Sequence, residues 1–215
     1  MEQSTTRVFA TSNPMQISYV LDAILQLNPQ SVLDIGCGSG KYGVLTREYL
    51  RKARIDGIEG FVQYVTDVHR LTYNNIYIGN AMQIAPKIDF SYDLVVMIDM
   101  LEHLTPEEGA RLLNDLSKCS RTILISVPVW HPEQGTVDGN VLQEHHAQYN
   151  VASLRQLGFH QIWRISGSYI ALRGAGQVNL KLKVLKSAVA CLPPFWVSAM
   201  LAPIARKLIA PQKLG

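Results

Sequence analysis

The sequence predicts a doubly wound α/β fold built on a mostly parallel, seven-stranded sheet. Short apolar segments alternate with amphipathic segments along the chain, which is typical of repeated β-α-β units. One such segment is residues 32–40, Val-Leu-Asp-Ile-Gly-Cys-Gly-Ser-Gly. It begins with an apolar run that is typical of a buried strand, and a glycine-rich turn follows directly. The final two strand segments are too close in sequence for a parallel crossover, so we expect the last strand to be antiparallel.

Three alternations of strand and helix fill the first half of the chain. Apolar residues recur at helical spacing over 15–27, and Pro14 suits the first turn of that helix. The elements expected after it are strand 31–35, helix 40–53, strand 55–58, helix 61–71 and strand 76–78.

The second half contains the strongest strand signal, a continuous apolar run at 94–98 within the expected strand 92–98. Thr105, Pro106 and the acids at 107–108 are typical of a helix N-terminus. The remaining expected elements are strand 122–127, helix 151–157 and strands 161–165 and 169–173.

Length and composition are those of an ordinary globular protein. The chain has 215 residues, of which 47% are hydrophobic, enough for one domain with a substantial core. The net charge of +3 is too small to favour a nucleic-acid partner. Three widely spaced cysteines form neither a disulfide framework nor a zinc pattern, and the polar residues 1–13 do not resemble a signal peptide. We therefore expect a reducing, cytoplasmic location.

The glycines at 36, 38 and 40 indicate a ligand-binding turn. Without a Cβ, they let the backbone turn sharply and lie against a ligand. The dinucleotide fingerprint G-x-G-x-x-G would need a glycine where Lys41 stands, and an acid, Asp34, precedes the first glycine by two positions. An ordinary glycine-rich turn after a buried strand is the alternative.

The run from Asp34 through Gly36 and Gly38 to Gly40 resembles motif I of the class I S-adenosyl-L-methionine (SAM)-dependent methyltransferases. The resemblance spans about 14–173 and implies a Rossmann-like fold whose seventh strand is inserted antiparallel. It implies that the loop, including Cys37, wraps the methionine part of SAM, while Asp34 orients the loop and the amino group. The runs at 56–59 and 157–159 also resemble a poorly characterised bacterial group of small-molecule methyltransferases.

Two further positions follow strand ends and suit a nucleoside. Glu59 ends the second strand, where a carboxylate can accept from both ribose hydroxyls; Asp56 is its nearest rival. Asn80 and Ala81 follow the third strand, where many relatives carry Asp-Ala in contact with the adenine amino group. The amide of Asn80 can still accept there, although a turn-favouring role is equally consistent with its position.

The segment after the fourth strand, Asp99 to Leu104, resembles the stretch that borders the methyl-transfer site in small-molecule methyltransferases. Asp99 is therefore expected near the cofactor, and both Asp99 and His103 are candidate bases. Glu102 and His103 suit capping and packing of the turn equally well. A single Glu-His pair is too little to predict a metal site.

A long polar loop, 131–149, follows the fifth strand and is the expected place for acceptor recognition. His145 and His146 are further candidate bases there, because imidazole suits proton transfer near neutral pH. Solvated loop histidines are the alternative for each of these residues and for His131. Adjacent histidines without a clear carboxylate partner do not predict a metal.

The chain is expected to comprise a flexible arm at 1–13, a SAM-binding domain at 14–176 and an apolar, basic helical extension at 177–215. Residues 187–205 carry no charge but contain prolines that would break a membrane-spanning helix. Two short helices could then lie on the inner membrane surface, pack on the core, or form a homodimer contact through residues 180–210.

The predicted function is transfer of a methyl group from SAM to a small-molecule, sugar or lipid-linked acceptor, at oxygen. The segment 99–102 lacks the Asn-Pro-Pro-Tyr type of motif found where nucleobase or glutamine nitrogen is methylated, and nothing favours a nucleic-acid substrate. One alternative is a non-catalytic SAM-fold subunit that acts through the C-terminal extension. A nicotinamide-dependent oxidoreductase conflicts with Lys41.

Overall fold

A computed structural model describes residues 11–130, 135–136, 139–165 and 167–180. The chain divides into two units, residues 1–178 and 179–215, and the sheet belongs to the first. The predictions for the C-terminal extension, including the uncharged run at 187–205 and the contact through 180–210, lie almost entirely outside the described residues, as does His131. No helix among the described residues is long and apolar enough to cross a membrane.

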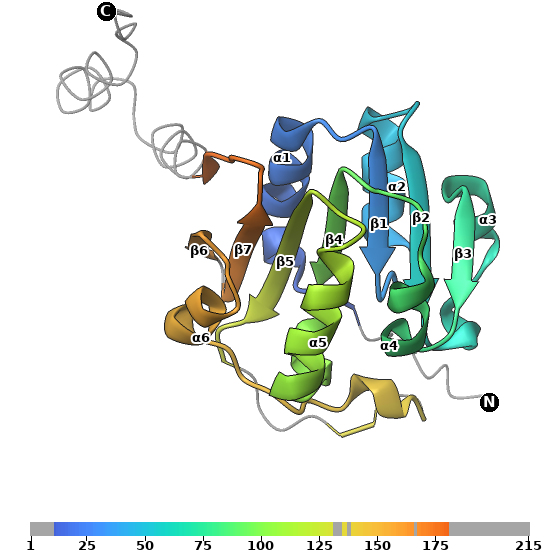
Figure 1. Cartoon of the computed structure of the whole chain (residues 1–215). Coiled ribbons are helices and arrows are strands. Elements are labelled where there is room, and N and C mark those ends of the chain that lie inside the picture. Colours follow the sequence, from blue (N-terminus) through green and yellow to red (C-terminus); the bar gives the residue numbers. More distant parts are fainter. Residues whose placement is uncertain (1–10, 131–134, 137–138, 166, 181–215) are drawn as a thin grey trace, which may run out of the picture. The chain divides into compact units, whose positions relative to one another are not determined.

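One seven-stranded sheet organises this unit, in the order β3-β2-β1-β4-β5-β7-β6 (Figure 1). Strands β1 to β5 pair in parallel where they are neighbours, while β7 is antiparallel to both β5 and β6. The fold class is confirmed, including the reversed strand. The strands are β1 (Ser31–Ile35), β2 (Arg54–Glu59), β3 (Asn75–Ile78), β4 (Leu94–Ile98), β5 (Thr122–Pro128), β6 (Gln161–Ile165) and β7 (Ser168–Gly174).

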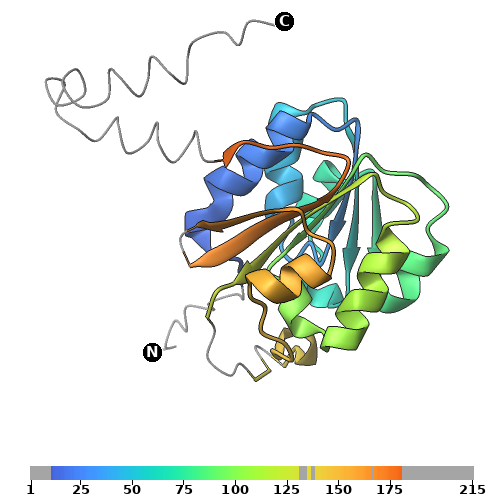
Figure 2. The ribbon, with the colours of Figure 1, turned by 60° about the vertical axis from the view of Figure 1, so that its left-hand side comes forward.

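Helices cover both faces of the sheet (Figures 1 and 2). α1, α2 and α3 lie on one face, with α2 in contact with both of the others, and α4, α5 and α6 lie on the opposite face. The helices are α1 (Ile17–Leu27), α2 (Lys41–Tyr49), α3 (Asp67–Thr72), α4 (Ala81–Ile84), α5 (Pro106–Leu116) and α6 (Val151–Gln156).

The expected helix over 61–71 is divided in the structure. A 3₁₀ turn at Val62–Tyr64 is followed by extended backbone at Thr66, which caps α3. The cap is a capping box in which His69 occupies the position usual for glutamate: its ring accepts from the Thr66 N–H. Apolar periodicity alone did not reveal this interruption, because the residues at the interruption include no glycine or proline.

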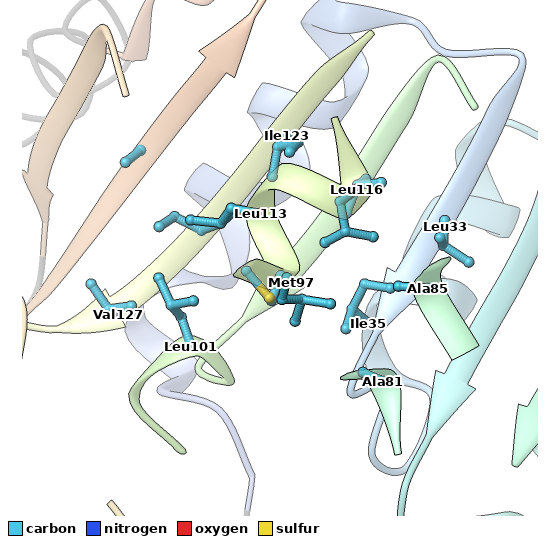
Figure 3. Packing of buried hydrophobic residues seen from close by; sticks show 14 of the residues in the cluster. Leu33, Ile35, Ala81, Ala85, Met97, Leu101, Leu113, Leu116, Ile123 and Val127 are labelled. Atoms are coloured by element: carbon cyan, nitrogen blue, oxygen red, sulfur yellow. The ribbon is translucent and has the colours of Figure 1, made fainter. Parts of the chain in front are cut away.

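The core between the sheet and α5 is packed by aliphatic side chains (Figure 3). Every residue of β1 and β4 is buried, as expected for central strands covered on both faces. Leu113 and Leu116 of α5 are fully buried and pack in one cluster with Leu33, Ile35 and Met97. This packing fixes the carboxyl ends of β1 and β4, from which the site is built.

On the other face, Gly43 of α2 lies against the ring of Tyr73. A Cβ added at Gly43 would stand 2.2 Å from the Tyr73 Cζ atom. We predict that Gly43→Ala lowers the free energy of unfolding by about 1–3 kcal/mol, since the overlap outweighs alanine's better helix propensity. Urea denaturation measures this change.

Gly135→Ala is the matched control, because a Cβ at Gly135 meets no atom within 4 Å. Equal stability of the two variants would show that α2 and Tyr73 move apart without cost.

Candidate cofactor and acceptor site

A cavity of about 640 Å³ opens at the carboxyl ends of β1, β2 and β4. β1 has β2 on one side and β4 on the other, so the cavity lies at the topological switch point of the sheet, where open α/β folds bind ligands. Most of the residues predicted from the sequence line it: Asp34, Gly36, Cys37, Gly38, Glu59, Asn80, Ala81, Asp99, His103 and His145. Gly40 and His146 do not.

The glycine loop between β1 and α2 depends on left-handed backbone angles. Gly36, Gly38 and Gly40 have φ of 67°, 56° and 86°, a region that favours glycine. A Cβ on Gly36 would stand 2.8 Å from the Met100 Cγ atom, whereas one on Gly38 would meet nothing within 4 Å. Gly38 therefore faces open space in the cavity, and Gly40, at the N-cap, begins α2.

Glu59 joins the end of β2 to this loop. Its Oε2 atom accepts from the Gly38 N–H at 2.7 Å, and its Oε1 atom accepts from the Phe61 N–H at 2.8 Å. Burial raises the pKa of the Glu59 carboxyl, and the surrounding backbone N–H groups oppose this shift. Each carboxylate oxygen can accept a second hydrogen bond, so Glu59 can hold the loop and also bind a ligand.

His69 holds the loop from the opposite side and was not predicted from the sequence. Its Nδ1 atom accepts from the Thr66 N–H, so the proton resides on Nε2, which donates to the Gly38 carbonyl at 2.9 Å. The ring is fully buried. The peptide groups on both sides of Gly38 are thus fixed, one by Glu59 and one by His69.

Asp34 is buried beneath the loop. The Tyr73 hydroxyl donates to its Oδ2 atom at 2.7 Å. Burial raises the pKa of the Asp34 carboxyl to about 7, with a smaller contribution from Glu59, while the Tyr73 hydrogen bond lowers it. Burial likewise raises the pKa of the Cys37 thiol. Both side chains are thus buried residues of the cavity wall.

Asp56 is the alternative to Glu59 as the acid predicted to bind the ribose, and it lies in a different environment. It is fully buried, does not line the cavity, and accepts from the side chains of Arg54, Tyr92 and Asn75 at 2.5–3.0 Å. These contacts tie β2 to β3 and to the entry of β4. The structure therefore favours Glu59 as the acid that faces a ligand.

Asn80 and Ala81 line the cavity at the start of α4. The Asn80 Oδ1 atom caps this helix by accepting from the Met82 N–H at 2.8 Å. Asn80 therefore does have the turn-forming role, and only the second lone pair of its Oδ1 atom remains for a ligand. Tyr64, which was not predicted, also lines the cavity, and its buried hydroxyl has no hydrogen-bond partner among the described residues.

Asp99 lies at the end of β4 with φ of 48°. Its carboxylate accepts from the Asn13 N–H, the Gln16 side chain and the Ser126 hydroxyl at 2.6–3.0 Å. Three protein donors therefore occupy most of its acceptor capacity, which makes Asp99 a weaker candidate base than the histidines. The contact from Asn13 brings residues 11–13 of the expected N-terminal arm to the cavity wall, where Ser12 accepts from the Lys41 ammonium.

The turn after β4 meets the loop that follows β5. The His103 Nδ1 atom lies 3.1 Å from the Glu144 carbonyl oxygen, and the rings of His103 and His145 have centroids 4.9 Å apart. His146 is exposed and does not line the cavity. The sequence pair is thus separated, with His145 at the cavity and His146 in solvent. Glu102 also lines the cavity, although it is only 2% exposed.

Comparisons with known proteins agree with this geometry. Residues 32–122, from β1 to the start of β5, match the family model described as a methyltransferase domain. A comparison of the sequence with curated proteins found no match. These residues are similar to a methyltransferase domain, and the predicted class I methyltransferase fold is confirmed by the solved structures.

Solved structures of low sequence identity share the fold. The N-terminal domain of EvdMO1 with SAH bound has a TM-score of 0.58 and 18% identity, covering 77% of this chain and 83% of that one. PigF with SAH has a TM-score of 0.56 and 15% identity, with 74% and 55% covered. Mitomycin 7-O-methyltransferase MmcR has a TM-score of 0.54 and 12% identity, with 74% and 54% covered. The alignment spans about half the length of the last two proteins.

The buried Asp34 carboxyl gives a testable pH dependence. In the folded chain it keeps its proton up to about pH 7, against an ordinary value near 3.8 when unfolded. Because the folded state then binds more protons, this group makes the free energy of unfolding fall as pH rises through that interval.

We predict that Asp34→Asn removes this contribution, about 1.4 kcal/mol per pH unit at its steepest. Urea denaturation of both proteins between pH 4.5 and 7, without cofactor, measures the difference. Parallel profiles for the two proteins would contradict the prediction.

Proposed function

We propose that this chain transfers the methyl group of SAM to a hydroxyl oxygen of a small-molecule, sugar or lipid-linked acceptor. The observation that carries the proposal is that one cavity is lined by two chemically different groups of residues. The Gly38 turn and Glu59 form the first group, here called the donor end, and His103 and His145 form the second, here called the acceptor end. A volume of about 640 Å³ falls within the range of small-molecule sites.

The donor end suits a nucleoside with a charged amino-acid portion. In this proposal the free lone pairs of Glu59 accept from the ribose hydroxyls, and the glycine loop lies along the methionine portion. Asn80, Ala81 and Tyr64 surround the adenine. The sulfonium makes the methyl group electrophilic, so the protein mainly has to align the nucleophile, the methyl carbon and the sulfur away from water.

The acceptor end suits an oxygen nucleophile. Burial lowers the pKa of the His103 imidazole, although nearby backbone carbonyls oppose this shift. A neutral imidazole can accept the hydroxyl proton as the oxygen attacks. The similarity to mitomycin 7-O-methyltransferase supports oxygen as the methylated atom.

The alternative of a non-catalytic subunit depends on the extension at 177–215, most of which the structure does not describe. SAH binding without turnover over a broad panel of hydroxyl acceptors would favour it. The nicotinamide hypothesis finds no support, because Lys41 occupies the position of the missing glycine and binds the N-terminal segment through Ser12.

We predict that Glu59→Gln weakens SAM and SAH binding by at least tenfold, since hydrogen bonds to a charged acceptor contribute about 1.5–3 kcal/mol. Isothermal titration calorimetry of the purified chain measures this change. Glu107→Gln, at an exposed acid in the first turn of α5, is the matched control and should bind like the wild type.

Absence of SAM and SAH binding in the wild-type chain would overturn the proposed function. Unchanged affinity in Glu59→Gln would instead reassign the ribose contact.

A further inference from the structure

We propose that Glu102, His103 and His145 bind a divalent transition-metal ion at the acceptor end of the cavity. The role suggested for the ion, holding the acceptor hydroxyl, rests on the proposed function. The binding of the ion does not. The sequence did not predict this site, because no carboxylate was evident beside the loop histidines.

The three side chains form a compact set of potential ligands. One carboxylate oxygen and one ring nitrogen from each histidine all lie within 4.8 Å of one another. An ion with bonds of about 2.1 Å holds its ligand atoms at most about 4.2 Å apart, so small side-chain rotations complete the set. All three residues line the cavity, which leaves room for an exogenous ligand.

Glu102 is the most telling member of the set. It is 2% exposed, and its Oε2 atom has no hydrogen-bond partner among the described residues. A buried acid without a partner is costly, and a bound cation supplies the missing partner.

His103 is oriented as a metal ligand. A carbonyl oxygen can only accept, so the contact between Nδ1 and the Glu144 carbonyl at 3.1 Å places the proton on Nδ1. Nε2 then carries the lone pair. Metal-binding histidines characteristically donate their other N–H to such a carbonyl.

Backbone hydrogen bonds bring His145 to this turn. The Glu102 carbonyl accepts from the His146 N–H at 2.8 Å and from the Ala147 N–H at 3.1 Å. The loop is therefore fixed next to the 3₁₀ turn Leu101–His103, and the cluster exists before any ion binds.

The ligand set determines the class of ion. Two imidazoles and one carboxylate favour zinc, iron or cobalt over magnesium or calcium, which prefer all-oxygen sites. Three protein ligands with an open position are typical of catalytic sites. With the ion bound, the lone pairs of His103 and His145 ligate it, so the ion takes the place of a histidine base: an acceptor hydroxyl on the ion would lose its proton to solvent more readily. Its oxygen would then bond to the methyl carbon as the carbon–sulfur bond breaks and that electron pair returns to sulfur.

The test is metal titration of the full chain after chelator treatment and dialysis. Calorimetry with Zn²⁺, and visible spectroscopy with Co²⁺, should show one ion per chain with nitrogen and oxygen ligation. Glu102→Gln and His145→Ala should each weaken binding by at least the roughly 10–100-fold that loss of a residue hydrogen-bonded to a metal ligand typically costs, because each removes a direct ligand. His146→Ala is the matched control, since His146 is exposed, and should leave metal affinity unchanged.

Circular dichroism confirms that the variants fold, and Glu102→Gln preserves the shape of the side chain. Absence of saturable binding of either ion, or equal affinity in Glu102→Gln, His145→Ala and the wild type, would overturn the proposal. SAH titration is a separate measurement. SAH binding without metal binding overturns only this inference, whereas metal binding without SAH binding overturns only the proposed function.

Discussion

The architecture of the site depends on the fixation of one residue, Gly38. Its N–H donates to Glu59 and its carbonyl accepts from His69, so two residues from different segments hold the same turn. The turn needs a positive φ, which side chains other than glycine rarely adopt. The loop follows β1, and Glu59 ends β2, so the loop is anchored to two buried strands. These contacts give the glycine-rich loop a defined path beside the cavity.

Much of the fold could be predicted because its signals are local. Strand β1 and the apolar run of β4 are continuous in sequence, and a reversed final strand follows from the short connection between β6 and β7. The glycine loop and Glu59 were recognisable because the loop directly follows β1 and Glu59 is the last residue of β2. Parallel pairing then brings them together without further information.

The remaining features depend on contacts between distant segments. His69 lies 31 positions from Gly38, inside a segment that looked like continuous helix, so its role could not be read from spacing. Asp56 and Glu59 are three residues apart, and the sequence favoured Glu59 without excluding Asp56; only the sheet shows that Asp56 is enclosed by Arg54 and Tyr92. Likewise, the different environments of His145 and His146 arise from the backbone contacts of one loop with Glu102.

The reversed direction of β7 has a consequence for the evolution of specificity. A seventh strand parallel to β5 would begin at the end of the sheet opposite the cavity. β7 instead begins beside the cavity, and Gly167 and Ser168 line that cavity. Gly167 and Ser168 therefore reach the cavity without belonging to the strands that carry the glycine loop and Glu59. In the proposed function, these two positions can be exchanged to suit a new acceptor while the residues proposed to hold SAM stay intact.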